Sequence, residues 1–451
     1  MIAVFVIGYI AIALEHNIKI DKAASALAIG GITWALLAFL GDTDLLNEWI
    51  DEKTKKGFNF KETPQWYDFL KYEIQHHIVH ISEILFFLLG AMTIVELIDA
   101  HQGFSIITNK ITTTNKVKLM WILSTITFFF SAALDNLTTA IVMAALLTKL
   151  IKDKNDRWLF AGIVILSANA GGAWSPIGDV TTIMLWIGGQ VTASNIIMSI
   201  IIPSLVCAVV PLIYLSFRLK GNIQRPADPV LEEHKINPTT PFERNLIFYM
   251  GVLGLLFVPI FKIVTHLPPY VGMLLSLGIL WITTEIIHRS KNHEQKSQLS
   301  VISVLKKIDT PTIFFFLGIL LAVSALQSAG QLKIVAEFLE KSFNGDIYLI
   351  NIIIGLLSSI VDNVPLVAGA MGMYEIEPST TGLWYPQDHT FWEFLAYCAG
   401  TGGSVLIIGS AAGVAVMGII KMDFIWYVKN ISLLALMGYF SGALTYFLLN
   451  Q

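Results

Sequence analysis

The stretches Leu134-Asp135-Asn136-Leu137 and Val361-Asp362-Asn363-Val364 each interrupt an otherwise apolar segment, and they lie 227 residues apart. In both, an acid next to a carboxamide falls near the middle of a segment long enough to enter a lipid bilayer. Because a carboxylate is costly in hydrocarbon, an acid at this depth indicates a functional site. The same costly pair placed twice predicts an internally duplicated membrane protein with a polar site at its midplane.

The composition is typical of an integral membrane protein. The 451 residues are 55% hydrophobic and 14% charged, with a mean hydropathy of +0.67, whereas a soluble domain carries about 25% charged residues. The apolar segments are long enough for helices rather than barrel strands. We therefore expect an all-α polytopic protein without a nucleic-acid partner, a cofactor or a structural metal. Cys207 and Cys398 lie in apolar segments, which favours packing roles over a disulfide.

Two further patterns recur at nearly the same offset. The sequence FFLLG at 86–90 corresponds to FFFLG at 314–318, which is 228 residues later. A set of glycines recurs 231 residues later: Gly171, Gly172 and Gly178 correspond to Gly402, Gly403 and Gly409. Three matches in the same order, close to one offset, predict two structural repeats.

The charges of the loops predict that the two repeats are inverted relative to each other. The loop after the first Asp-Asn pair is basic (Lys149, Lys152, Lys154 and Arg157), whereas the equivalent stretch 374–390 contains no lysine or arginine. Lysines also precede the first pair, so both flanks of 118–148 are expected on the cytoplasmic side. This segment would then be a re-entrant hairpin with Asp135-Asn136 at its tip. The same rule places further basic residues inside: Arg218, Lys220, Arg225, Lys235, Arg244, Arg289, Lys291, Lys296, Lys306 and Lys307.

We expect four parts along the chain: scaffold helices with an external loop at 1–78, a first inverted repeat at 79–217, a linker with scaffold helices at 218–311, and a second inverted repeat at 312–451. The external stretch 41–78 mixes lysines with acids and could include an amphipathic surface helix.

Each repeat should also contain a broken transmembrane helix. The apolar spans 158–190 and 391–420 are too long for one straight crossing, and Gly-rich residues interrupt both. Unwound carbonyls and hydroxyls are hard oxygen ligands that suit a small cation. The alternative interpretation is a close-packed face between helices.

The side chains near these interruptions favour a cation. Asp135 and Asp362 occupy the two hairpin tips, Asp179 lies in the first break, and Ser410 stands at the equivalent position of the second. Because the carboxylates would repel an anion, and because one carboxylate can bind either a proton or a metal ion, competition is sufficient for exchange of H⁺ against Na⁺ or Li⁺.

Four stretches closely resemble the motifs of NhaD-type sodium/proton antiporters, in the ion transporter superfamily: FFLLGAMTIVELIDAHQGF at 86–104, SAALDNLTT at 131–139, residues 167–182, and SSIVDNV at 358–364. The resemblance covers nearly the whole chain. It implies a secondary antiporter that exchanges Na⁺ (or Li⁺) for H⁺ in pH homeostasis, with an elevator mechanism, a homodimer and a bacterial inner membrane. It also implies the residues of the ion and proton site: Asp135, Asn136, Asn169, Asp179, Thr181, Thr182, Ser358, Asp362 and Asn363.

Two weaker signals remain open. Glu96 and Asp99 lie near the inner end of a helix. One interpretation is that they only mark a helix end at the membrane interface. The other, which the resemblance favours, is that they form an ion entrance or a pH sensor. His76, His77 and His80 have a spacing that could hold zinc, although surface histidines are the preferred interpretation.

Two other functions compete with cation exchange. The first is a dicarboxylate or other anion symporter of the same superfamily, which would have neutral hydroxyl and amide groups at the tips. The second is an intramembrane aspartyl protease with Asp135 and Asp362 as its dyad. The matching, duplicated surroundings of the two acids argue against unequal catalytic roles, so we expect a transporter and not an enzyme. The whole interpretation requires Asp135 and Asp362 to converge inside the protein.

Overall fold

The computed structural model describes residues 1–450 with the exception of 14, 56–62, 109, 227–238, 293–295, 297–298 and 379–382. The described residues form helices, and their only strand-like features are the isolated bridges Asn115–Asn222 and Glu375–Trp384. Eight of the described helices are long and apolar enough to cross a membrane. The prediction of an all-α polytopic membrane protein is therefore confirmed.

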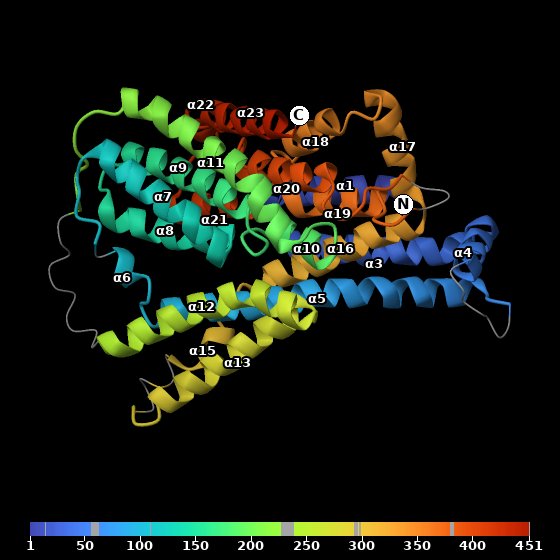
Figure 1. Cartoon of the computed structure of the whole chain (residues 1–451), viewed down its shortest axis with the longest axis horizontal. Helices are drawn as coiled ribbons and strands as arrows, with labels where there is room; N and C mark the ends of the chain where they lie inside the picture. Colours follow the sequence, from blue (N-terminus) through green and yellow to red (C-terminus); the bar gives the residue numbers. More distant parts are fainter. Residues whose placement is uncertain are drawn as a thin grey trace. The chain divides into compact units, whose positions relative to one another are not determined.

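The candidate spans share a long apolar run: α3 (Lys22–Leu40), α5 (Trp66–Ala100), α7 (Lys116–Leu134), α11 (Ala193–Arg218), α12 (Pro241–Thr265), α13 (Pro269–Ile287), α16 (Thr310–Ser328) and α23 (Ser432–Leu449) (Figure 1). Among the other helices are α1 (Ile2–Ala13), α4 (Thr43–Lys55), α8 (Asn136–Leu150), α9 (Lys154–Ala173), α10 (Val180–Ile187), α18 (Ile347–Leu357), α19 (Asn363–Met373), α20 (Thr390–Gly402), α21 (Ala411–Ile420) and α22 (Phe424–Asn430).

The chain folds into two compact units. The first consists of Met1–Leu85, Asp309–Asp346 and Val367–Pro386, and the second of Phe86–Ile308, Ile347–Leu366 and Gln387–Gln451. Helix α5 begins in the first unit and continues in the second. It starts at Trp66, well before the apolar segment that marks it in the sequence, because the polar residues preceding that segment are also helical.

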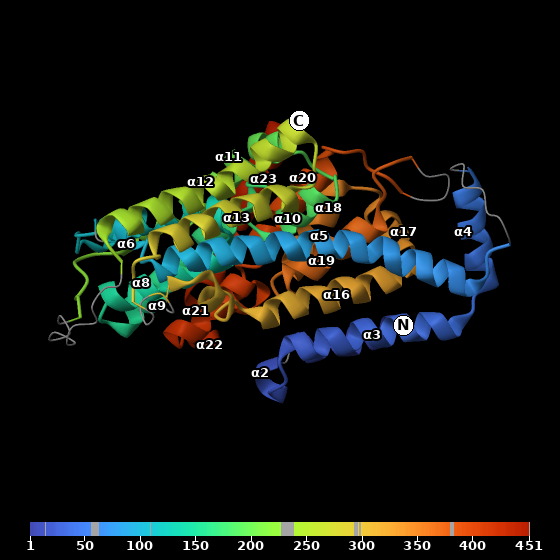
Figure 2. The same ribbon diagram turned by 90° about the horizontal axis from the view of Figure 1, so that it is seen from below.

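In the first unit, α3 and α16 lie side by side (Figure 2). Their backbones approach closely at Gly318, where a Cβ atom would collide with the backbone of Ala26 and Leu27. The Trp34 indole N–H donates to the Leu321 carbonyl oxygen (2.9 Å).

The stretch 41–78 contains the short helix α4 in its described part. The apolar side of α4 packs on the start of α5, where the ring of Trp49 contacts those of Phe69 and Tyr72, with centroids 5.6 and 5.4 Å apart. An amphipathic helix therefore exists in this stretch, and its exposed polar side chains, including Asp44, explain why the sequence alone suggests a surface element.

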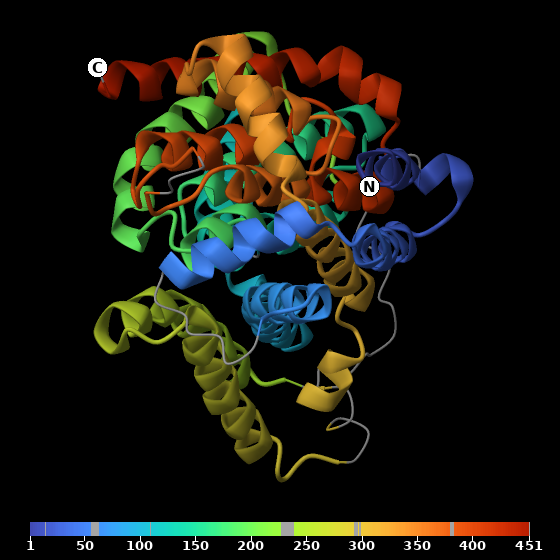
Figure 3. The same ribbon diagram turned by 90° about the vertical axis from the view of Figure 1, so that its right-hand side faces the viewer.

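In the second unit, the broken helices form the core. All residues of α20 from Phe391 to Gly402 are buried, as are those of α9 from Phe160 to Ala173. Such helices are covered on every side, and their neighbours α7, α8, α11 and α18 supply the cover. Helices α12 and α13 pair as an antiparallel hairpin within this unit, and α12 also contacts α7 (Figure 3).

Candidate functional site

Helices α7 and α8 form a hairpin with Asp135 at its tip. Helix α7 ends at Leu134 and α8 begins at Asn136. At the other end, the Lys116 N–H donates to the Gly221 carbonyl (3.1 Å) and the Lys152 N–H donates to the Gln224 carbonyl (2.8 Å). Both open ends of the hairpin are thus attached to one short segment, so the chain enters and leaves on the same side (Figure 1). Whether this tip stops inside a bilayer stays a prediction.

Asp135 has a backbone conformation that is rare for a residue with a side chain. Its φ and ψ are 78° and 159°, a region occupied almost only by glycine, at a cost of about 1–3 kcal/mol. Its carboxylate caps α8, accepting bonds from the Thr138 N–H (2.7 Å) and the Thr138 hydroxyl (2.8 Å). Asp135 is thus a helix cap, but capping does not require this strained backbone, and strain of this kind is typical of functional positions.

Asp179 lies at the centre of the candidate site. It is 1% exposed and caps α10 immediately after the break that follows α9. Its Oδ1 accepts bonds from the backbone N–H (2.9 Å) and hydroxyl (2.8 Å) of Thr181. The Thr182 hydroxyl accepts from the Asp179 N–H (3.3 Å) and donates to the Asp179 carbonyl (2.8 Å), completing a capping box.

The asparagines of both duplicated pairs converge on Asp179. The Asn136 carboxamide donates to Asp179 Oδ2 (2.5 Å) and also to the Asn169 side-chain oxygen (3.1 Å). The Asn363 carboxamide donates to both Asp179 oxygens at 3.3 Å. Asp135 and Asp362 lie close enough to Asp179 to repel its charge. Asp179 is thus within electrostatic range of both hairpin-tip acids, and the role of the three acids in ion binding stays a prediction.

Asn169 connects the two Gly-rich breaks. It is fully buried, and its carboxamide nitrogen donates to the hydroxyls of Ser404 (2.9 Å) and Ser410 (3.0 Å) in the second break. The sequence pattern indicates Ser410 only as the neutral counterpart of Asp179 and does not indicate Ser404. The sequence feature that points to both serines is their position in a Gly-rich break. The remaining predicted residue, Ser358, donates its hydroxyl to the Ala399 carbonyl of α20 (2.9 Å).

The predicted glycines permit close approach of helices. A Cβ atom on Gly171 would fall on the carbonyl oxygen of Phe128 in α7, and one on Gly402 would fall on the carbonyl oxygen of Gly355 in α18. Next to these residues, Cβ atoms on Gly172 and Gly403 would strike the carbonyl oxygens of the glycines that follow in their own breaks, Gly178 and Gly409. The packing interpretation therefore applies to these positions, and the helices are also interrupted there, between Ala173 and Val180 and between Gly402 and Ala411.

Two of the three carboxylates, those of Asp135 and Asp179, form no ion pair with a lysine or arginine among the described residues. A buried carboxylate without such a partner must bind a proton or a metal ion, because leaving the charge uncompensated is costly. The surrounding donor set of carboxylates, carboxamides and hydroxyls consists of the hard oxygens that alkali cations prefer.

The weaker candidates lie elsewhere. Asp99 lines a cavity of about 720 Å³, whereas Glu96 is not among the residues that line it. Of the histidines, His77 is 3.0 Å from the Ser328 hydroxyl and 3.6 Å from Glu73, and the ring of His76 lies edge-on to that of His80. No group of three or more potential metal ligands occurs among the described residues.

The known proteins that this chain resembles are transporters. The model of the citrate transporter family matches residues 2–387. Sodium/proton antiporter 2 of Arabidopsis thaliana is 40% identical over 449 residues, covering 99% of this chain and 98% of the relative. Sodium/proton antiporter 1 of the same plant is 48% identical over 376 residues, and the match spans 83% of this chain but only 63% of that relative.

A bacterial relative matches over a similar length. The Na⁺/H⁺ antiporter NhaD of Vibrio cholerae is 28% identical over 475 residues, covering 99% of this chain and 91% of the relative. The chain therefore belongs to the transporter family that the citrate transporter model describes, and within it to the NhaD-type sodium/proton antiporters.

Proposed function

We propose that this protein exchanges Na⁺ (or Li⁺) for H⁺ by alternating access, with both ions competing for the carboxylates around Asp179. The observation that carries the proposal is the convergence of Asn136 and Asn363 on one buried carboxylate that has two further acids beside it. Such a cluster holds too much negative charge to stay empty of cations in a low-dielectric interior. Because proton and metal ion neutralise the same oxygens, binding of one displaces the other. The names of the relatives support these two ions as the cargo.

The proposed binding residues are the nine predicted ones, with distinct roles. Asp179 and Asp135 carry the exchangeable charge, and Thr181 and Thr182 hold the Asp179 end of the break in place. Asn136 and Asn363 connect the two hairpin tips to Asp179, while Asn169 connects the two breaks. Ser358 fastens the second tip to α20, and Asp362 completes the acidic cluster. A bound cation would require one or more of the carboxamides to turn an oxygen toward it.

The test is sodium-driven proton movement in everted membrane vesicles. Asp135→Asn should abolish exchange, because asparagine caps a helix as well as aspartate but carries no charge. Asp153→Asn is the matched control, since Asp153 caps α9 in the same way (2.8 Å to the Asp156 N–H) and is exposed to solvent. Full exchange by Asp135→Asn, in protein inserted at the wild-type level, would rule out the assignment.

Transport of a citrate-like anion is the alternative raised by the description of the matched family. The structure disfavours it, because a polyanion in this site would face the repulsion of Asp135, Asp179 and Asp362. Citrate uptake into proteoliposomes that is independent of Na⁺/H⁺ exchange would favour the anion carrier instead. The protease alternative has no support, since the family consists of transporters.

We further propose that the chain contains two inverted repeats with hairpin tips and broken helices, divided as 1–78, 79–217, 218–311 and 312–451. The support is that contacts recur at the two offsets seen in the sequence. The Ser131 hydroxyl donates to the Ala168 carbonyl (2.5 Å), as the Ser358 hydroxyl does to the Ala399 carbonyl. Asp179 and Ser410 cap equivalent helices with φ of −147° and −140°.

Cysteine labelling tests the inverted orientation. Lys152→Cys and Gln387→Cys lie in equivalent loops and should react with membrane-impermeant reagents from opposite sides of the membrane. The native Cys207 and Cys398 are buried, so they leave a low background. Labelling of both positions from one side would contradict the inverted arrangement.

The elevator movement, the homodimer and the membrane are proposals that rest on the family resemblance. Native mass spectrometry of the purified protein tests the dimer, and crosslinking of the second unit in two states tests the movement. A bacterial inner membrane is supported by the NhaD relatives from bacteria, whereas two relatives of higher identity come from a plant. Fractionation of the native cells decides between these membranes.

A further inference from the structure

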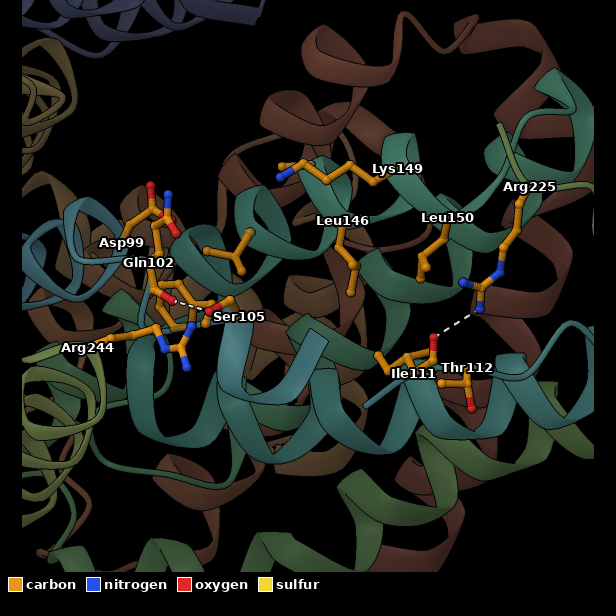
Figure 4. Close-up of a pocket in the computed structure, with 13 residues that line it drawn as sticks. Asp99, Gln102, Ser105, Ile111, Thr112, Leu146, Lys149, Leu150, Arg225 and Arg244 are labelled. Carbon is orange, nitrogen blue, oxygen red and sulfur yellow. Dashed lines mark hydrogen bonds between the residues drawn. The ribbon is translucent and has the colours of Figure 1, made fainter. Parts of the chain in front are cut away.

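The second unit contains a polar cavity whose lining includes none of the residues assigned to the ion and proton site. It has a volume of about 720 Å³ and lies between the end of α5, the α8 surface, the segment before residue 227 and the start of α12. Figure 4 shows Asp99, Gln102 and Arg244 at one end and Thr112 and Arg225 at the other, with Lys149 between them.

The charge of this cavity is predominantly positive. Lys149, Arg225 and Arg244 line it, and Asp99 is the acid among its described lining residues. Lys307 adds further positive potential at Asp99. A cavity of this charge would repel Na⁺, so it does not suit a cation entrance, and it would concentrate anions.

None of the three cations forms an ion pair with another described residue. Asp99 is the described acid beside them in the cavity lining, and Lys149 interacts with its charge. Two acids close to these cations in the chain pair with other lysines: Glu243, next to Arg244, pairs with Lys291 (2.7 Å), and Asp156, which follows Lys149, pairs with Lys116 (2.6 Å).

An arginine beside the cavity also has a hydrogen-bond donor without an acceptor among the described residues. The Arg244 Nε–H is buried and has no acceptor in the described part of the chain. One Arg225 nitrogen donates to the Ile111 carbonyl (3.0 Å), which holds that guanidinium at the cavity wall. Buried donors are normally satisfied, and the Arg244 Nε finds no acceptor among the described residues around the cavity.

We propose that this cavity binds a ligand with two phosphate groups, either the headgroup of a diphosphate phospholipid or a soluble organic diphosphate. A guanidinium group can bind two oxygens of one phosphate. One arginine at each end of the cavity therefore matches a ligand with two separate phosphate groups. Leu146 and Leu150 of α8 supply an apolar wall beside these cations, as a lipid with its chains in the bilayer requires. All three cations belong to stretches whose basic charge predicts a cytoplasmic location, where basic pockets between helices bind such headgroups.

The experiment measures binding to the purified full-length protein without any ion gradient, so its outcome is independent of whether the chain exchanges cations. Native mass spectrometry counts cardiolipin retained from mixed phosphatidylcholine–cardiolipin nanodiscs. A second arm follows the shift of the unfolding midpoint with pyrophosphate in lipid-free detergent at constant ionic strength. Cardiolipin retention without a pyrophosphate effect identifies the lipid, and the reverse identifies a soluble diphosphate.

Single variants locate the site. Arg225→Gln and Arg244→Gln should each weaken binding about tenfold or more, as expected for the loss of a charge-assisted hydrogen bond. Arg289 and Lys118 are exposed cations outside the cavity, so they serve as controls. Arg289→Gln and Lys118→Gln should change binding less than threefold. Asp99→Asn should strengthen binding, because it removes the acid of the cavity, and a gain cannot come from misfolding.

Three results would overturn the proposal. The first is that neither probe binds, the second is equal effects of cavity and control variants, and the third is weaker binding by Asp99→Asn. Binding of citrate in preference to both phosphate probes would overturn the assigned ligand class.

Discussion

Replacement of Asp179 by asparagine is the most direct test of the site. The carboxylate accepts from the Thr181 N–H, the Thr181 hydroxyl and the carboxamides of Asn136 and Asn363. Asparagine keeps one oxygen, which can stay with Thr181, and places an NH₂ group against two carboxamides that currently donate. Those carboxamides can rotate, but rotation of Asn136 would break the hydrogen bond that its side-chain oxygen accepts from the Leu137 N–H (2.8 Å).

The expected structural cost is that of one or two buried hydrogen bonds, about 1–3 kcal/mol. The expected effect on ion binding is larger. A cation about 4 Å from a carboxylate gains about 4 kcal/mol at an effective dielectric constant of about 20. Removing that charge should therefore raise the half-saturating Na⁺ concentration by about a thousandfold, which abolishes exchange at ordinary salt concentrations.

The assay is Na⁺-dependent proton movement in proteoliposomes over a wide range of Na⁺ concentrations, with the unfolding midpoint measured on the same protein. Asp153→Asn is again the control for removal of a helix-capping charge. The reasoning is refuted if Asp179→Asn folds and keeps its half-saturating Na⁺ concentration within threefold of the wild type.

Three further predictions concern stability and the second break. Gly402→Ala should lower the free energy of unfolding by about 1–3 kcal/mol, because its Cβ atom would strike the Gly355 carbonyl, whereas Gly278→Ala meets open space and should have little effect on the unfolding midpoint. Burial lowers the pKa of His288 to about 4, and repulsion from His101 contributes to this shift. As the pH falls from about 6.5 to 4, the unfolded chain takes up a proton that the folded chain does not, so the free energy of unfolding should fall by up to about 3 kcal/mol. His288→Gln should flatten this part of the dependence of stability on pH. An unchanged slope in that variant would contradict the assignment. Ser410→Ala removes one acceptor of the Asn169 carboxamide and should reduce the maximal exchange rate severalfold while leaving the protein folded; wild-type kinetics would show that this bond is dispensable.

The amino-acid sequence was sufficient to predict the class of fold and the position of the acids. Asp135 and Asp362 are recognisable because charge in an apolar segment is costly wherever it occurs, so a local pattern reveals it. The glycines at the two breaks are visible for a similar local reason, since they interrupt long apolar spans. The hairpin at Asp135 followed from the lysines on both of its flanks, and both ends of that hairpin do attach to one segment.

The tertiary structure decided which groups meet. Nothing local indicates that Asn363 donates to Asp179 or that Asn169 reaches Ser404, because these pairs are separated by 184 and 235 residues. The His101–His288 contact (2.7 Å between their Nε2 atoms) is equally invisible in the sequence.

The basic cavity also shows the difference between what the sequence predicts and what the tertiary structure decides. The sequence predicted on which side of the membrane Arg225 and Arg244 lie, because that depends on the number of charges in a loop. Only packing brings them to one cavity with Lys149 while placing Glu243 against Lys291. Burial preferences belong to single residues and can be read along the chain, whereas the pairing of charges depends on distances that exist only after the helices have packed.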